Sequence, residues 1–497
     1  MVFSRASGVL MHISSLAGEY GIGTMGKSAY EFVDFLKKNE QSYWQILPLC
    51  PTSFESGNSP YQSESTFAGN PLFIDLEILK KEGYLSEEDL KENRQKNTKR
   101  VDYASLYKSR HKVFLKAFEV FLKNSPKDFS LFCKEQKYWL DDYALFMAIK
   151  QENKKKPITN WQAEIRDREK TALKEWQAKL KNETLYHKML QYFFFKQWYE
   201  LKQYANKNGV QIIGDIPIYV SSDSADVWAN PKNFMLSSKL KPIAVAGCPP
   251  DKFSVNGQLW GNPVYDWDAL KKDRYDWWIK RIGHSLKMYN AIRIDHFRGF
   301  ESFYCVPYNS KTAKVGTWLK GPGMDLINEV KKNFKDAKII AEDLGFLTDS
   351  VRELVKDSGY YGMKIMQFAF NGSEGRDYLP HNYTKNSVVY TGTHDNDTLL
   401  GYLKFAKAEE INYAKRYLRT ENLAEGIMAA TLASTPNLSI IPMQDILGLG
   451  YTARMNIPST SSGNWEWRCG DNQLFEVTDF LLKNTRLYGR GVKNETT

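Results

Sequence analysis

Residues 292–295 read Ile-Arg-Ile-Asp (IRID), a short β-branched apolar run that ends in a carboxylate. The pattern recurs in three other segments: IIGD at 212–215, IIAED at 339–343 and VVYTGTHD at 388–395. Such runs are typical of buried strands in a parallel sheet. Four acids in series at strand ends predict a barrel whose catalytic face collects carboxylates from separate strands. Chemistry at a glycosidic bond requires carboxylates arranged in this way.

Eight apolar runs with β-branched residues are spread along the chain, and each is a candidate strand. They cover residues 8–13, 43–49, 210–218, 291–297, 337–344, 364–370, 387–392 and 438–443. Amphipathic helical segments lie between most of the later runs, for example at 277–289 and 324–334. Strands that alternate with helices are typical of an α/β fold with a parallel sheet. Eight such units predict a closed (β/α)8, or TIM, barrel.

A barrel of this type needs about 250 residues. A single catalytic barrel over residues 1–497 must therefore carry large insertions. Residues 72–203 are rich in Lys, Glu, Leu and aromatic residues at helical spacing, which predicts a mostly helical subdomain between strands 2 and 3. Residues 221–272, rich in Gly, Pro, Asn and Ser, are predicted to be a loop-rich insertion that carries the active-site lid. The tail, 464–497, is too short for a C-terminal β-sandwich.

The formal net charge of +10 does not indicate a nucleic-acid-binding protein. The lysines lie mostly in helical stretches interleaved with glutamate, such as 91–100 and 150–156, which are typical of solvated helix faces. No run of about 18 apolar residues is present, and the N-terminus lacks the layout of a secretory signal. These features predict no membrane association and a cytoplasmic location.

The five cysteines are scattered and form no CxxC or Cys/His cluster. The sequence therefore predicts reduced thiols and no structural zinc, and the lack of an H-x-x-x-H or His/Asp ligand spacing predicts no other metal site. It carries no signal for the oligomeric state.

Asp295 and Glu342 are the predicted catalytic pair. Retaining glycosyl transfer needs an ionised carboxylate that attacks the anomeric carbon and a carboxylic acid about 5 to 5.5 Å away that protonates the leaving oxygen. The two acids end consecutive, and therefore neighbouring, predicted strands. Asp is shorter and suits a fixed nucleophile, whereas Glu reaches further and suits an acid/base. Arg293 shares a strand face with Asp295 and would keep it ionised, although an ordinary ion pair at a strand end is the alternative.

Two further acids complete the predicted cluster. Asp395, preceded by His394, follows the seventh strand, and Asp215 follows the third. A third carboxylate near the pair could bind two sugar hydroxyls as positive charge develops on the sugar ring. The alternative for Asp395 is a helix N-cap. His394 and His12 are candidates for hydrogen bonds to sugar hydroxyls, with a structural histidine as the alternative for each.

Nine segments carry a resemblance to a known family. They are GVLMHISSLAGEYGIG, WQILPLCPT, SPYQSESTFAGNPLFIDL, GDIPIYVSSDSADVWANP, FSVNGQLWGNPVYDW, RIDHFRGF, AEDLG, GTHDNDT and GNWEWR. In this combination they resemble the bacterial 4-α-glucanotransferases, also called amylomaltases or disproportionating enzymes, relatives of the α-amylase barrel. The resemblance runs over nearly the whole chain, from Arg5 to Arg468.

The resemblance assigns roles to individual residues. RIDHFRGF implies that Asp295 is the nucleophile and Arg293 its arginine, AEDLG implies that Glu342 is the acid/base, and GTHDNDT implies that Asp395 is the third carboxylate. These agree with the choices made from strand ends. It further implies glucan contacts from His394 and from a set of residues outside the pair: Ser59, Tyr61, Asp215, Trp260 and Asn464.

The expected reaction is transfer of α-1,4-glucan between maltooligosaccharides or to glucose by double displacement, without a cofactor. A transferase must keep water from its covalent intermediate, and Phe253 and Trp260, with Gly257 and Gly261 as flexible points, fit a lid. A packing role is the alternative for Phe253. An α-amylase-like hydrolase would use the same catalytic residues and is the alternative function. A non-catalytic glucan-binding protein is a third hypothesis.

Overall fold

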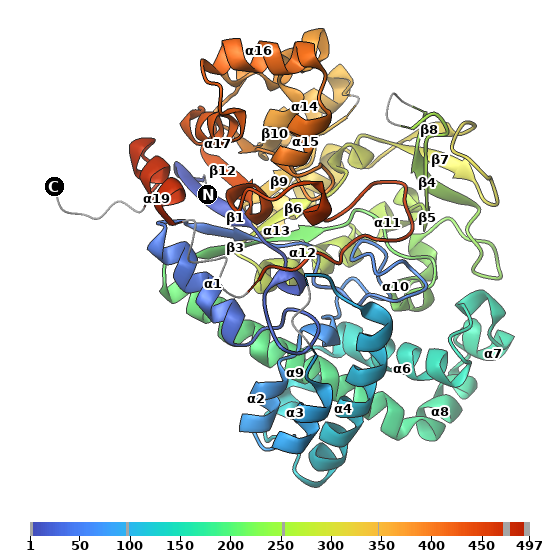
Figure 1. Cartoon of the computed structure of the whole chain (residues 1–497). Coiled ribbons are helices and arrows are strands. Elements are labelled where there is room, and N and C mark those ends of the chain that lie inside the picture. The colour runs from blue at the N-terminus through green and yellow to red at the C-terminus, as the bar shows by residue number, and fades with distance from the viewer. Residues whose placement is uncertain (1–2, 96–98, 251–253, 346, 471–477, 492–497) are drawn as a thin grey trace.

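The computed structural model describes residues 3–95, 99–250, 254–345, 347–470 and 478–491. Its centre is a sheet of eight parallel strands (Figure 1). These are β1 (Ala6–Leu10), β2 (Tyr43–Gln45), β3 (Gln211–Ile216), β6 (Ala291–Ile294), β9 (Ile339–Ala341), β10 (Gly362–Ile365), β11 (Ser387–Tyr390) and β12 (Leu438–Pro442). Each strand overlaps one of the eight predicted apolar runs, so the strand prediction is confirmed.

The sheet closes on itself. Its strand order is β10-β11-β12-β1-β2-β3-β6-β9. The two outermost strands are joined by a parallel bridge between Ile340 and Tyr361. Hydrogen bonds run from the N–H of Ala341 to the carbonyl of Tyr361 (2.8 Å) and from the N–H of Tyr361 to the carbonyl of Ile339 (3.1 Å). The predicted (β/α)8 barrel is confirmed, and β6 lies between β3 and β9 as neighbours.

The alternation of side chains along each strand explains why acids face the barrel mouth. One buried cluster, which includes Ile213, Ala291 and Ile340, fills the barrel interior. Successive side chains of a strand point to opposite faces, so the residue two positions later returns to the inside. The residues two positions after Ile213, Ala291 and Ile340 are Asp215, Arg293 and Glu342. The sequence pattern alone therefore directs these three polar side chains into the barrel mouth.

Amphipathic helices cover the outside of the barrel. They include α1 (Lys27–Lys38), α12 (Asp276–Met288), α13 (Met324–Asn333), α14 (Asp349–Ser358) and α17 (Leu423–Ala433). In α1, for example, Ala29, Phe32, Val33 and Leu36 are buried, at spacings of three and four residues. The C-terminal described segment forms one helix, α19 (Thr478–Leu487), and the described residues contain no strand after β12.

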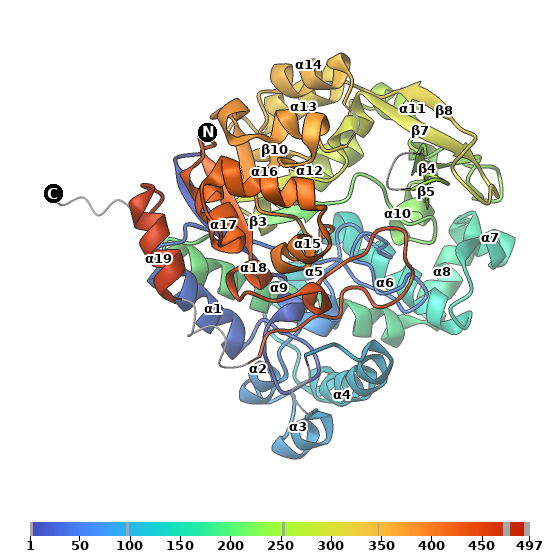
Figure 2. The ribbon, with the colours of Figure 1, turned by 45° about the horizontal axis from the view of Figure 1, so that its top comes forward.

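Between β2 and β3 the chain is helical. The helices are α2 (Leu76–Lys81), α3 (Glu87–Asn93), α4 (Tyr103–Lys123), α5 (Phe129–Glu135), α6 (Lys137–Glu152), α7 (Ala163–Arg166), α8 (Lys170–Lys179) and α9 (Lys181–Lys207). Figures 1 and 2 show α2 to α8 gathered on one side of the barrel, whereas the long α9 runs back to it. Among the described residues, no helix is long and apolar enough to span a bilayer.

The segment 221–272 contains more regular structure than its loop-like composition predicted. It forms α10 (Ala225–Ala229), β4 (Ala244–Cys248), β5 (Gln258–Pro263) and α11 (Trp267–Lys272). β4 pairs with β5 and also with β7 (Ser302–Pro307), which in turn pairs with β8 (Thr317–Lys320), giving a four-stranded antiparallel sheet in the order β5-β4-β7-β8. The sheet depends on strands that follow β6, so the composition of 221–272 alone did not reveal it.

Candidate active site

Arg293 connects two of the predicted acids. It lies on β6 directly opposite Asp215 of β3. Its Nη1 donates hydrogen bonds to both carboxylate oxygens of Asp215, at 2.9 and 2.8 Å. The same nitrogen lies 3.0 Å from Oδ1 of Asp295. The side chains of Arg293 and Asp215 are buried, whereas that of Asp295 is 28% exposed.

The charge of Arg293 is stabilised by these contacts. Burial alone would lower the pKa of the guanidinium, but the carboxylates of Asp215 and Asp295 outweigh burial and raise the pKa of Arg293 well above its ordinary value. The arginine therefore remains cationic at every pH at which the protein is folded. It provides a fixed positive charge behind Asp295, as the sequence predicted.

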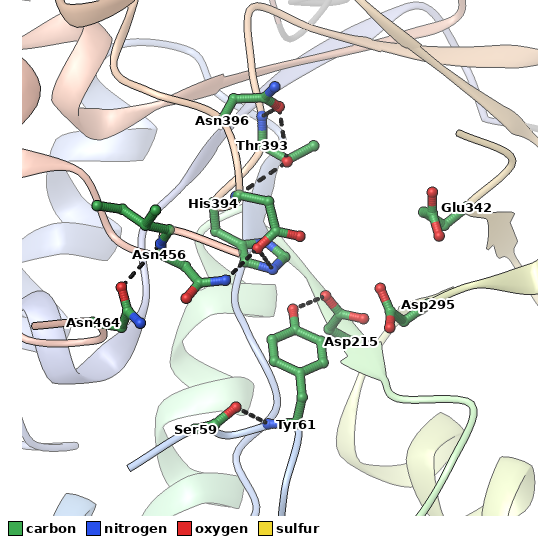
Figure 3. Close-up of polar contacts among 12 residues, drawn as sticks. Ser59, Tyr61, Asp215, Asp295, Glu342, Thr393, His394, Asn396, Asn456 and Asn464 are labelled. Atoms are coloured by element: carbon green, nitrogen blue, oxygen red, sulfur yellow. Dashed lines mark hydrogen bonds and ion pairs between the residues drawn. The ribbon is translucent and has the colours of Figure 1, made fainter. Parts of the chain in front are cut away.

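Glu342 follows β9 and is held by two backbone donors. The N–H of His296 donates to Oε2 at 2.7 Å, and the N–H of Leu344 donates to Oε1 at 3.0 Å. His296 has a φ of 50°, a left-handed conformation that is uncommon outside glycine. This sharp turn directly after Asp295 aims the N–H of His296 at Glu342. Figure 3 shows both side chains, and the negative charge of Glu342 raises the pKa of Asp295, as expected of two carboxyl groups in one cluster.

The carboxyl groups of Asp295 and Glu342 hold their protons unusually tightly. Burial, aided by the negative charges of Glu342, Asp215 and Asp395, raises the pKa of Asp295 to about 8 against the opposing effect of Arg293. Burial also raises the pKa of Glu342, although Arg293 and the two backbone donors oppose the rise. Two coupled acids with raised pKa values share a proton near neutral pH. One ionised and one protonated carboxyl are then available together.

Asp395 is fixed by its neighbours on one side. Its Oδ1 accepts a hydrogen bond from Nδ2 of Asn456 at 2.6 Å and lies 3.3 Å from Nε2 of His394. Burial lowers the pKa of His394 even though Asp395 opposes this, so the imidazole is neutral at neutral pH. The N-cap of the following helix, α15 (Leu399–Phe405), is Thr398. The N-cap alternative for Asp395 is therefore wrong.

Tyr61 joins Asp215 to His394. Its hydroxyl donates to Oδ2 of Asp215 at 2.8 Å, and its ring stacks on the imidazole of His394, with centroids 5.1 Å apart and planes 13° apart. Burial and the charge of Asp215 raise the pKa of Tyr61 well above its ordinary value, so its hydroxyl stays protonated. Ser59 accepts a hydrogen bond from the N–H of Tyr61 at 3.3 Å and shapes this loop (Figure 3).

Trp260 lies on β5, at the edge of the mouth. Its ring meets that of His296 edge to face, with centroids 4.8 Å apart, and its indole N–H donates to Oε1 of Gln258 at 3.1 Å. Trp260 therefore contacts His296, and the N–H of His296 in turn donates to Glu342, the acid/base candidate. Phe253, the other predicted lid residue, lies outside the described residues.

Asn464 and His12 lie apart from the carboxyl groups. Oδ1 of Asn464 accepts a hydrogen bond from the N–H of Ile457 at 2.9 Å, and its Nδ2 donates to the carbonyl and hydroxyl of Thr460. The amide of Asn464 therefore holds its own loop together. His12 is buried, its ring packs edge to face on Phe73, and burial lowers its pKa to about 3, as in a structural histidine.

A small hollow lies beside His394, on the side of β1, β11 and β12. Thr393, His394, Asp397 and Arg454 line it together with His12, whereas Asp295 and Glu342 do not. It is therefore adjacent to the carboxylate cluster without containing its two central acids. In the part of the chain that the structure describes, no three His, Cys, Asp or Glu side chains are placed to hold a metal ion.

Sequence reasoning missed two groups at this site. The backbone N–H of His296 gives no signal in the sequence, because any residue in that position would supply it. Asn456 lies 61 residues from Asp395, in a segment that no strand pattern connects to the catalytic face. An alignment of relatives could have singled out Asn456, whereas only the fold shows the turn at His296.

Comparison with known proteins assigns the family. A family model described as 4-alpha-glucanotransferase matches residues 11–473. The 4-alpha-glucanotransferase of Clostridium butyricum is 49% identical over 487 residues, which is 97% of this chain and 100% of the relative. Amylomaltase from Streptococcus agalactiae in complex with acarbose has a TM-score of 0.95 at 44% identity, covering 98% of this chain and 100% of that one. Amylomaltase from Corynebacterium glutamicum, at 19% identity, a TM-score of 0.77 and coverage of 98% and 74%, shares the fold.

Proposed function

The chain belongs to the 4-alpha-glucanotransferase family, and on that premise we propose that it transfers α-1,4-glucan segments between maltooligosaccharides, or to glucose, by a retaining double displacement. The observation that carries this proposal is the pairing of Asp295, in contact with the buried cation Arg293, with Glu342 on the neighbouring strand. The structurally similar amylomaltase from S. agalactiae binds acarbose, which supports a glucan-binding mouth.

In the first step the enzyme breaks the glycosidic bond. The ionised carboxylate of Asp295 attacks the anomeric carbon, while Glu342 donates its proton to the departing O4. The products are a β-glycosyl ester on Asp295 and a shorter glucan that leaves with a new 4-hydroxyl. Arg293 favours the ionised form of Asp295, and the proton shared by the pair then resides on Glu342.

In the second step an acceptor replaces the leaving group. Glu342, now ionised, takes the proton from the 4-hydroxyl of glucose or a maltooligosaccharide, and that oxygen attacks the anomeric carbon. The ester bond to Asp295 breaks, an α-1,4 bond forms, and Glu342 regains its proton. Two inversions give net retention of configuration. The N–H groups of His296 and Leu344 stabilise Glu342 while it is ionised.

The remaining predicted residues bind the sugar that reacts. Asp395 and His394 contact its hydroxyls, and Tyr61 offers its aromatic face. Asp215 is buried behind Arg293, so its main role is to hold that guanidinium. Ser59 and Asn464 accept hydrogen bonds from backbone N–H groups of their own loops and so stabilise the conformation of the loops that line the mouth.

Transfer requires that an acceptor sugar reaches the intermediate before water does. We assign the preference for a sugar acceptor over water to the insertion 221–272. In this insertion Trp260 covers the turn that holds Glu342, and Phe253 is the second proposed lid residue. The insertion 72–203 forms a helical subdomain beside the single barrel. No step of the reaction needs a cofactor. Cys50, Cys133 and Cys305 carry free thiols, which supports activity in the reducing cytoplasm.

Maltotriose separates transfer from hydrolysis. We expect the enzyme to convert maltotriose into glucose and a ladder of longer maltooligosaccharides, because each donor bond that breaks is replaced by a new α-1,4 bond. Chromatography of the products, with a parallel assay of reducing ends, measures both reactions. A rise in reducing ends equal to the number of bonds cleaved would favour the α-amylase-like hydrolase instead. No product at all would favour a glucan-binding protein.

A further inference from the structure

The segment 454–465 is bonded to the turn that carries His394 and Asp395, and Figure 3 shows Asn456 beside His394. Three hydrogen bonds connect them: from Nη2 of Arg454 to the carbonyl of Asp395 (2.6 Å), from the N–H of Asn456 to the carbonyl of His394 (3.1 Å), and from Nδ2 of Asn456 to Oδ1 of Asp395 (2.6 Å). The first two fix the backbone, and the third fixes the carboxylate itself. The rotamer of Asp395 is therefore set from outside its own loop.

The two oxygens of Asp395 have different surroundings. Oδ1 accepts from Asn456 and faces His394, whereas Oδ2 has no hydrogen-bond partner among the described residues. The side chain of Asp395 remains 42% exposed. With Oδ1 occupied, the carboxylate presents Oδ2 to the mouth. We propose that Asn456 is a positioning residue that aims this oxygen at the sugar, a proposal that rests on the function assigned above to Asp395.

The amide of Asn456 has the chemistry that this role needs. It donates a hydrogen bond without adding a positive charge, so Asp395 keeps its full negative charge for the transition state. An arginine or lysine at this place would neutralise the carboxylate that it orients. The backbone carbonyl of Asn456 accepts a hydrogen bond from Nε of Arg454 at 2.7 Å. This bond holds Asn456, whose side chain donates to Asp395, in place.

Asn464 supports the same arrangement from further away. Its Oδ1 accepts from the N–H of Ile457, the residue after Asn456, and its amide nitrogen donates to Thr460. The N–H of Trp465 also donates to the carbonyl of Met455 at 2.7 Å. These bonds close the loop on both sides of Asn456. The resemblance predicts that Asn464 contacts the glucan, and these bonds show that it also holds the loop that carries Asn456.

Kinetics of Asn456→Ala test the proposal. Losing a hydrogen bond to a charged group is expected to lower kcat for maltotriose about 10- to 100-fold, with KM changed less than about threefold, because Asn456 acts on Asp395 and not on bound substrate. Affinity for acarbose should fall with kcat/KM. Ser462→Ala, at an exposed serine of the same segment, is the matched control. An unchanged kcat, or a change in KM alone, would contradict the positioning role.

Asn456→Asp gives a signature that a general loss of folding cannot produce. An ionised aspartate would repel Asp395, whereas a protonated one can again donate a hydrogen bond. The activity of this variant relative to the wild type is therefore expected to rise as the pH falls, and an equal ratio at all pH values would overturn the proposal. If the wild type hydrolyses maltotriose, the transfer function fails, but these ratios still test Asn456.

A second observation concerns an exposed aromatic pair next to this segment. Phe405, the last residue of α15, and Tyr451 are 67% and 51% exposed. Their rings lie 6.0 Å apart, and Nζ of Lys404 lies 5.5 and 5.1 Å from their centroids. α15 begins four residues after Asp395, and Tyr451 comes three residues before Arg454. Along the chain, the pair therefore adjoins both the turn that carries Asp395 and the segment that is bonded to that turn.

Exposed aromatic rings that adjoin one another are typical of an interaction site, whereas an isolated exposed ring is not. Sugar rings pack on aromatic faces, and an ammonium group can donate to sugar hydroxyls. We infer that Phe405, Tyr451 and Lys404 form an outlying site for a linear α-1,4-glucan whose reacting end occupies the mouth. The inference rests on the proposed substrate class. It predicts that the site matters for long glucans and not for maltotriose.

The double variant Phe405→Ala/Tyr451→Ala tests the site in the full-length enzyme. We expect KM for amylose to rise about three- to tenfold, retention in an amylose-containing native gel to fall, and kinetics with maltotriose to stay unchanged. Leu487→Ala, at a residue that is 68% exposed on α19, is the control. Unchanged retention and KM for amylose would overturn the inference. A change in the oligomeric state of the double variant would also overturn the inference, because it would show that the two rings lie in an interface between two copies of the protein.

Discussion

Asp295→Asn is expected to lower the turnover of maltotriose on the order of 10³-fold or more. A carboxamide is a poor nucleophile and cannot form the glycosyl ester, while its size preserves the packing beside Arg293. Steady-state transfer of maltotriose measures the loss. The matched control is Asp226→Asn, another buried acid whose pKa is raised by burial, in α10, outside the carboxylate cluster. Equal turnover by the Asp295→Asn enzyme would show that Asp295 is not the nucleophile.

The same substitution should make stability less sensitive to pH. The pKa of Asp295 in the fold is about 8, above its ordinary value of 3.8, mainly because of burial. The two acids share this proton, so the stability that the protonated pair Asp295/Glu342 contributes is fully present below the ordinary pKa and is lost as the pH rises through the folded value. Asparagine has no charge to gain. Between about pH 4 and pH 8, the thermal midpoint of the variant should therefore fall less than that of the wild type.

Glu342→Gln should separate the two steps of the reaction. With maltotriose, activity is expected to fall at least about 100-fold, since the amide cannot protonate O4. An α-maltosyl fluoride donor needs no protonation of its leaving group, so the first step should recover. The second step still lacks its base, and a covalent maltosyl ester on Asp295 should accumulate. Mass spectrometry of the intact protein and of its peptides detects that ester.

The pH profile provides a second readout for Glu342. In the wild type, kcat/KM for maltotriose should decline as the pH rises past about 8, because the pair Asp295/Glu342 then loses the proton that the first step needs. With the fluoride donor, formation of the ester by Glu342→Gln should show no such decline. Glu301→Gln, a buried glutamate that pairs with Lys320, serves as control. A failure to trap the ester would contradict the double displacement.

Much of the fold follows from local patterns in the sequence. Each barrel strand is short and buried, and its β-branched residues favour extended backbone whatever lies next to it. The period of two along a strand then places Asp215, Arg293 and Glu342 on the inner face, two positions beyond apolar residues that fill the barrel. These features depend on neighbouring residues only, which is why they could be predicted.

Other features depend on segments that meet only after folding. β4 and β5 read as loop, although they pair with each other, and the second neighbour of β4 in the sheet, β7, lies beyond β6. The link from Asn456 to Asp395 likewise joins residues with no common sequence pattern. The left-handed turn at His296 arises where the chain leaves β6 next to Glu342. No local propensity encodes such contacts.

The sequence by itself determined that eight strands form a barrel and that acids and an arginine face its mouth, because strand propensity and side-chain alternation are local properties of the backbone. Only the tertiary structure decided how those acids are held: Arg293 between Asp215 and Asp295, two backbone N–H groups on Glu342, and Asn456 on one oxygen of Asp395. Hydrogen bonds act over about 3 Å. Their partners are therefore fixed by where the chain returns in space, which no local pattern specifies.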